Sequence, residues 1–112
     1  MKTSSCKAKG RRLSQSVKDK LIEWAPDLKD NDILVTSSGV TGPDLVLSPK
    51  AQEYYPLVFE MKNQEKLNIW ASLEQSQSHK KTDTEYPILC FSRNRSETYV
   101  ALKLDDFLKL VR

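Results

Sequence analysis

Two acidic side chains and a lysine stand where this chain is otherwise apolar. Asp44 precedes the apolar run Leu45–Leu47, and Glu60 and Lys62 close the run that begins at Leu57. Charged side chains rarely end up beside a sheet core unless a partner neutralises them. A divalent metal ion that also binds phosphate is such a partner. The set therefore predicts metal-dependent hydrolysis of a phosphodiester bond.

Strand geometry aligns two members of this set. Side chains at positions i and i+2 of a strand point to the same side, so Glu60 and Lys62 face one way and Met61 faces the opposite layer. Asp44, Glu60 and the backbone carbonyl of Met61 offer oxygen atoms, the ligands that hard cations prefer. Water and a phosphate oxygen would complete an octahedral Mg²⁺ site. Lys62 would orient the attacking water or stabilise the charge that develops at phosphorus.

The same residues also fit an ordinary surface strand end, with a Glu/Lys pair across strands and an aspartate in a turn. A Glu-x-Lys triplet is common and carries little information alone. The metal interpretation gains from the turn Gly42-Pro43-Asp44, which opens the preceding strand, and from the helix expected after Lys62.

The elements that must position this set are expected in the order α-β-β-β-α-β-β-α. We expect helices at 13–24, 67–78 and 106–111, the last capped by Asp105, strands at 33–36, 44–47, 57–62, 88–92 and 98–104, and a short turn or helix at 51–55. Leu13, Val17, Leu21 and Trp24 share one face of the first helix, which Pro26 ends. Residues 88–92 are apolar throughout, which predicts a central strand.

Length and charge favour one domain with a basic end. The chain has 112 residues, which suits one compact domain, and a net charge of +3. Residues 1–20 carry seven basic side chains and one acidic one, whereas the rest carries 11 basic and 14 acidic ones. We expect residues 1–12 to form a flexible basic arm and residues 13–112 a single nuclease-like domain. The arm suits phosphate, although a solvated tail explains its charge equally well.

Cysteine and histidine are too sparse for a zinc cluster. The chain holds only Cys6, Cys90 and His79, and we expect Cys90 to be a buried thiol and His79 an exposed helix end outside the site. No apolar run approaches the ~20 residues of a membrane helix. The basic residues 1–12 lack the apolar stretch of a secretory signal. We therefore expect a cytoplasmic protein without a membrane partner.

The blocks Gly42-Pro43-Asp44 and Phe59-Glu60-Met61-Lys62-Asn63 resemble the PD-(D/E)XK nuclease superfamily. Residues 9–108 look like its small phage-encoded branch related to Holliday junction resolvases, most specifically over 60–70 and 91–96. The resemblance implies an α/β fold with a restriction-endonuclease-like αβββαβ core, a mixed sheet flanked by helices, an extra strand and a short C-terminal helix. It also implies that Asp44 and Glu60 are metal ligands, that Lys62 is the catalytic lysine, and that the cofactor is Mg²⁺, with Mn²⁺ as a substitute. A phage-encoded protein would act in the host cytoplasm.

One acidic ligand of that family has no clear counterpart here. Archaeal resolvases carry a glutamate early on the first helix, soon after a Lys-Gly pair, whereas here Lys9-Gly10 is followed by Ser14-Gln15. The additional ligand is left open among Gln15, Asp19 and Glu23. Related nucleases often place a polar residue of the second helix near the metal or the DNA, which singles out Gln75.

Basic and hydroxyl side chains outside this set are the expected contacts to DNA phosphates. Arginine forks and donors in turn-rich loops suit phosphate oxygens, although solvated surface residues fit the same positions. The predicted DNA contacts are Lys7, Lys9, Arg11, Arg12, Ser38, Thr41, Arg93 and Arg95.

The leading hypothesis is a Mg²⁺-dependent DNA endonuclease that is selective for branched DNA. A chain this short has little room for a base-reading domain, which favours recognition of backbone and shape. Two symmetric cuts in a four-way junction imply a homodimer. Two alternatives stay open, namely a DNA-binding accessory protein of the same fold without catalysis, and a restriction-type or single-strand nuclease of that fold.

Overall fold

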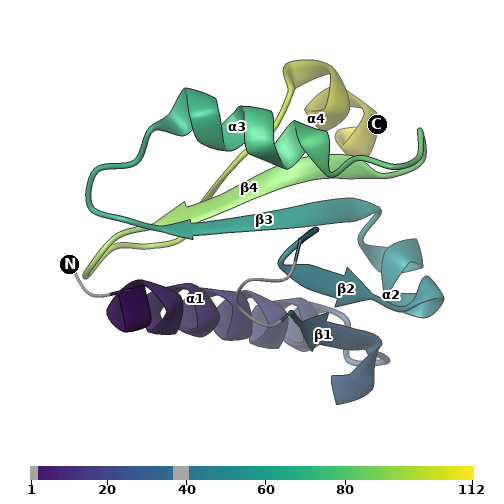
Figure 1. Cartoon of the computed structure of the whole chain (residues 1–112). Helices are drawn as coiled ribbons and strands as arrows, with labels where there is room; N and C mark the ends of the chain where they lie inside the picture. Colours follow the sequence, from purple (N-terminus) through teal and green to yellow (C-terminus); the bar gives the residue numbers. More distant parts are fainter. Residues whose placement is uncertain (1–2, 37–40) are drawn as a thin grey trace.

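The structure is a computed structural model that describes the backbone of residues 3–36 and 41–112, with side chains described from residue 8 onward within these ranges. The predicted order of helices and strands is confirmed, the short turn or helix expected at 51–55 is a helix that begins at Pro49, and a 3-10 turn is added. In chain order the elements are α1 (Thr3–Trp24), η1 (Asp30–Asp32), β1 (Ile33–Val35), β2 (Leu45–Leu47), α2 (Pro49–Tyr54), β3 (Leu57–Asn63), α3 (Ile69–Ser78), β4 (Tyr86–Ser92), β5 (Tyr99–Ala101) and α4 (Leu104–Val111) (Figure 1).

A mixed sheet in the order β3-β4-β5 forms the centre of the molecule. β3 and β4 run parallel, with Glu60 opposite Leu89 and Met61 opposite Cys90, and β5 pairs antiparallel with the other edge of β4. The prediction of a central strand at 88–92 is therefore confirmed. The α/β class with a mixed sheet between helices is confirmed as well.

The first two strands do not belong to this sheet. β1 and β2 form a separate antiparallel pair, with Leu34 opposite Val46, in addition to the mixed sheet. The pair meets β3 through Asp44, whose N–H donates to the carbonyl of Phe59 at 2.9 Å. Beyond Asp44, β2 and β3 do not pair, and residues of both strands line one pocket.

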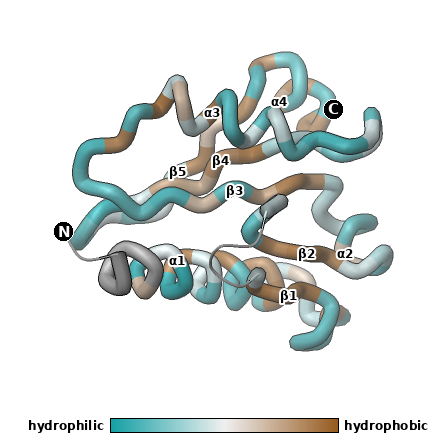
Figure 2. The backbone as a smooth tube through the Cα atoms, in the orientation of Figure 1, coloured by the Kyte–Doolittle hydropathy of each residue, from teal (hydrophilic) through white to brown (hydrophobic). Residues whose placement is uncertain are grey.

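The two faces of the central sheet differ in what covers them. Phe59, Met61 and Cys90 join Leu13 of α1 in the buried core, so α1 covers this face. Glu60 lies on the opposite face by the alternation of side chains along a strand, and α3 and α4 cover that side (Figure 1). Figure 2 shows the strands β1 and β2 and the first half of β3 as predominantly hydrophobic.

Helix α1 is longer than the pattern of apolar residues predicts. It begins at Thr3 rather than near Leu13, so it passes through the boundary drawn at residue 12. The added turns contain good helix formers, and Gly10 costs only about 1 kcal/mol relative to alanine. Trp24 was expected on the packed face but is 79% exposed, because the helix ends there, before Pro26. Whether residues 1–12 contact DNA stays a prediction.

Helix α3 packs through small side chains rather than large ones. Asn68 caps its start by accepting a hydrogen bond from the Ala71 N–H at 3.1 Å. Ser72 and Ser76 are its buried residues, whereas Trp70 is 79% exposed. The sequence favours either the core or a subunit interface for Trp70, and this exposure excludes the core. Serine at the contact lets the helix approach the sheet closely.

The C-terminal elements differ from their predicted bounds. β5 is shorter than the predicted strand at 98–104, because α4 already begins at Leu104. Its N-cap is Lys103, and Asp105 lies in the first turn, where its charge favours the helix dipole, so the predicted Asp105 cap is wrong. Within the part of the chain that the structure describes, no helix has the length and apolar composition needed to cross a membrane.

Candidate active site

Asp44 is held against β3 by both its backbone and its side chain. Its N–H donates to the Phe59 carbonyl at 2.9 Å, and its Oδ2 accepts a hydrogen bond from the Met61 N–H at 2.7 Å. The turn before it contains Gly42 with φ 119°, a value that favours glycine. These bonds lie on either side of Glu60 along β3, so Asp44 is placed beside Glu60.

Glu60 is a buried carboxyl group whose ionisation is opposed by its surroundings. The residue is 5% exposed. Burial is the main cause that raises its pKa from 4.5 to about 7, the charge of Asp44 and a hydrogen bond with it raise that pKa further, and Lys62 lowers it. The predicted set Asp44, Glu60 and Lys62 is thus brought together in space.

The peptide of Met61 faces the same edge of β3 as Asp44. Its N–H is bonded to the Asp44 carboxylate, and the N–H and C=O of one strand residue point to the same edge. The Met61 carbonyl is therefore directed toward the Asp44 side rather than toward β4. Its side chain packs in the core on the α1 face, as predicted from the alternation.

Lys62 lies two residues beyond Glu60 on the same face and is partly buried. It borders a pocket of about 430 Å³, shared with Lys9 and Gly10 of α1 and with Asn63 at the end of β3. The Asn63 Nδ2 donates to the Lys9 carbonyl at 3.5 Å, which ties the start of α1 to the end of this strand. The pocket gives Lys62 access to solvent.

His79 is the residue that sequence reasoning missed. It follows α3 as its C-cap, its side chain is 15% exposed, and its Nδ1 lies 3.1 Å from Glu60 Oε1. The expected exposed position outside the site is therefore wrong. A usable signal was present, because Ser72, Ser76 and His79 recur at helical spacing, so that a small-residue stripe leads to the histidine.

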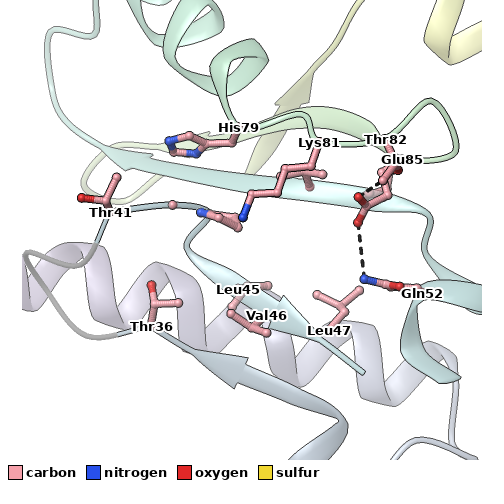
Figure 3. Close-up of a pocket in the computed structure, with 14 residues that line it drawn as sticks. Thr36, Thr41, Leu45, Val46, Leu47, Gln52, His79, Lys81, Thr82 and Glu85 are labelled. Atoms are coloured by element: carbon pink, nitrogen blue, oxygen red, sulfur yellow. Dashed lines mark hydrogen bonds between the residues drawn. The ribbon is translucent and has the colours of Figure 1, made fainter. Parts of the chain in front are cut away.

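A pocket of about 430 Å³ lies between β2, the start of β3 and the segment that follows α3. Figure 3 shows its lining, with His79 and Lys81 above the sheet and Leu45, Val46 and Leu47 of β2 below. Across its far end Gln52 donates to Glu85 at 3.3 Å. Glu60 does not line this pocket, but His79, which does, lies 3.1 Å from it.

Several predicted ligands lie elsewhere. Gln15, Asp19 and Glu23 are exposed on α1, and Gln15 Nε2 donates to Asp19 Oδ1 at 2.9 Å. Because α1 covers the Met61 face, these side chains are not brought to Glu60 on the other face. Gln75 is exposed on α3, one position before the buried Ser76.

Four of the predicted DNA contacts converge on one surface. Lys9 and Arg12 of α1 and Arg93 and Arg95 of the β4–β5 turn border the same hollow of about 280 Å³. The turn is anchored by the Asn94 N–H, which donates to Glu65 at 2.6 Å. We call these four side chains the basic cluster.

The other predicted DNA contacts fall outside this cluster. Arg11 is exposed on α1. Thr41 lines the pocket of Figure 3. The Lys7 side chain and Ser38 lie outside the described residues.

The carboxylate pair fits a divalent cation. Glu60 Oε1 is buried without a hydrogen-bond partner among the residues that the structure describes, and Asp44 Oδ1 is not part of the bond to Met61. Within the same residues, no three His, Cys, Asp or Glu side chains already form a metal-holding group. Such a pair would share the ion with water and phosphate oxygens, as Mg²⁺ sites commonly do.

The only cysteine whose side chain the structure describes is not suited to act as a nucleophile. Cys90 is buried in β4, and burial raises the pKa of its thiol to about 12.

Comparison with protein-family models, with curated proteins and with solved structures gives no match.

Proposed function

We propose that this chain is a metal-dependent DNA endonuclease with a restriction-endonuclease-like fold, structure-selective for branched DNA. One observation carries the proposal, namely the bond from the Met61 N–H to Asp44 that sets two carboxylates side by side. The repulsion and burial that raise the pKa of Glu60 to about 7 are relieved when a cation joins the pair.

In this mechanism Asp44, Glu60 and the Met61 carbonyl would hold Mg²⁺, or Mn²⁺ in its place. The ion would supply Lewis-acid polarisation of the phosphate and acidify water. Lys62 stands one pleat further on the Glu60 face and orients the attacking water or stabilises the charge that develops at phosphorus. The buried position of Glu60 excludes bulk water and strengthens these electrostatic interactions.

The basic cluster supports the choice of a nucleic acid as substrate. Lys9, Arg12, Arg93 and Arg95 gather near the carboxyl end of β3, and the pocket beside Lys62 shares Lys9 and Asn63 with the cluster's hollow. A phosphate backbone that runs across the cluster would reach Lys62. Phosphate contacts carry no base information, which agrees with recognition of backbone shape.

A junction resolvase also requires a second copy of the chain, since two symmetric cuts need two sites. Exposed apolar side chains are available for such an interface at Trp70 of α3 and at Tyr99 and Val100 of the edge strand β5. Association would be tested by sedimentation of the free protein. A monomer that still makes paired cuts would contradict this part of the proposal.

The test is cleavage of labelled four-way junction, duplex and single-stranded DNA in Mg²⁺, with Lys62→Ala as the inactive variant. We expect cleavage of the junction by the native chain and none by the variant. Preferential cleavage of duplex or single strands would instead assign a restriction-type or single-strand nuclease. If the native chain cleaves none of these substrates more than Lys62→Ala does, the proposal that the chain is an endonuclease is wrong.

The second candidate is a DNA-binding protein of the same fold without catalysis. It is favoured by the position of Gln15, Asp19 and Glu23, which α1 keeps on the exposed side away from Glu60. Binding of the junction by both the native chain and Lys62→Ala, with no product from either, would support this candidate.

A further inference from the structure

Two buried polar atoms of the site face each other without forming a hydrogen bond. Glu60 Oε1 and His79 Nδ1 lie 3.1 Å apart, with side chains 6% and 15% exposed. Both atoms lack a hydrogen-bond partner within the described ranges, so their approach does not have hydrogen-bond alignment. Buried polar atoms rarely stay unpaired, which calls for a third group beside both of them.

The separation of these atoms suits two ligands of one metal ion. Nitrogen and oxygen ligands lie about 2.1 Å from a transition metal, so ligands at right angles are roughly 3 Å apart. In such a site each lone pair points at the ion rather than at the neighbouring ligand. This accounts for a short distance between His79 and Glu60 without hydrogen-bond alignment.

The fold keeps the histidine in this place. The His79 N–H donates to the Ser76 carbonyl at 3.2 Å, so the residue closes the last turn of α3. The His79 side chain also lines the pocket in which Lys81 lies, so the imidazole borders a space that is open to solvent (Figure 3).

The chemistry of imidazole then selects the class of ion. Mg²⁺ and Mn²⁺ prefer oxygen ligands, whereas imidazole suits Zn²⁺ and the later first-row ions from Fe²⁺ through Co²⁺ to Cu²⁺. We propose that Glu60 Oε1 and His79 Nδ1 bind one divalent transition-metal ion, completed by water and phosphate oxygens. The inference rests on the proposed function and deepens it, because it makes His79 a ligand and a transition metal the preferred ion.

The first test uses the single histidine of the chain as a probe. Long-range ¹H–¹⁵N NMR spectra of the whole chain are recorded during titration with Zn²⁺, which is diamagnetic. We expect the Nδ1 resonance of His79 to move to the position of a metal-bound nitrogen at one equivalent. An unchanged imidazole, or binding through Nε2 alone, would overturn the inference.

The second test compares affinities for Co²⁺ and Mg²⁺ by calorimetry. His79→Gln should weaken Co²⁺ binding by at least ~10-fold, the lower range for loss of a metal-site partner, and leave Mg²⁺ binding nearly unchanged. Lys81→Ala is the matched control, because it removes a pocket-lining cation that does not contact Glu60, and it should not weaken Co²⁺ binding. Equal Co²⁺ affinity in His79→Gln would assign His79 to a plain ion pair with Glu60 and overturn the inference.

The two proposals fail in different ways. If the chain cleaves the junction with Mg²⁺ but the His79 resonances do not respond to Zn²⁺, only the role of His79 as a metal ligand is contradicted. If His79 responds to Zn²⁺ but no metal ion supports cleavage, the endonuclease activity is contradicted and metal binding by Glu60 and His79 stands. The NMR test needs no variant, so it decides the matter even if His79→Gln does not fold.

Discussion

The two faces of β3 carry alternating residues of different kinds, apolar on one face and charged on the other. Phe59 and Met61 point into the core under α1, whereas Glu60 and Lys62 point toward α3 and the candidate site. The apolar face gains stability from burial, and the charged face loses some of it, since burial opposes ionisation of Glu60. One strand thus contributes to the core on one face and buries a carboxyl group at a cost in stability on the other. Such a local cost is the pattern expected of functional sites.

The largest effect should come from the charged face. Lys62→Ala should lower the rate of DNA cleavage by ~10³-fold, because the charge at phosphorus loses its stabilising partner. The fold should stay intact, since Lys62 is only partly buried. Single-turnover cleavage and thermal unfolding measure the two quantities. Lys66→Ala is the control at an exposed lysine, and an equal loss of cleavage there would contradict a specific role for Lys62.

Truncation on the apolar face should lower the stability of the fold rather than the rate of cleavage. Met61→Ala should lower the free energy of unfolding by about 2–5 kcal/mol through the cavity it leaves. Chemical denaturation measures this loss. The matched truncation Val46→Ala, at a residue 48% exposed, should cost much less. If both variants lose similar stability, Met61 does not belong to the tightly packed core.

A smaller effect should appear in the pH dependence of stability. Folding raises the pKa of Glu60 from 4.5 to about 7, so the folded state binds more protons than the unfolded state between these values. Stability from this residue should therefore fall as pH rises through that window and stay low above it.

Metal-free thermal unfolding between about pH 5 and pH 8 measures this dependence. Glu60→Gln should reduce the decline relative to the native chain, because the variant has no carboxyl group to titrate. The same decline in both proteins would place its origin elsewhere and would remove the contrast between the two faces of β3.

The smallest effect concerns the basic cluster at the end of the strand. Arg93→Ala should reduce the slope of log affinity for DNA against log salt by roughly one unit, because one phosphate contact is lost. Fluorescence anisotropy at several salt concentrations measures the slope. Lys20→Ala, at an exposed position further along α1, should leave it unchanged. Equal slopes for the native chain and Arg93→Ala would remove Arg93 from the DNA surface.

Much of the fold followed from local pattern. The order of elements and the central position of β4 were predictable, because apolar periodicity and Pro26 are local signals. The start of α1 at Thr3 was not, since the first turns lack apolar spacing. The division of the strands into two sheets was not predictable either, because strand pairing depends on contacts between residues distant in sequence.

The candidate site shows the same boundary between local and distant information. The alternation of side chains along any strand is enough to place Glu60 and Lys62 on one face and Met61 on the other. The bond from the Met61 N–H to Asp44, the approach of His79 to Glu60 and the position of the acids of α1 on the other side of the sheet depend on tertiary packing. Periodicity describes one element at a time, whereas the distance between two elements depends on how their faces pack against each other.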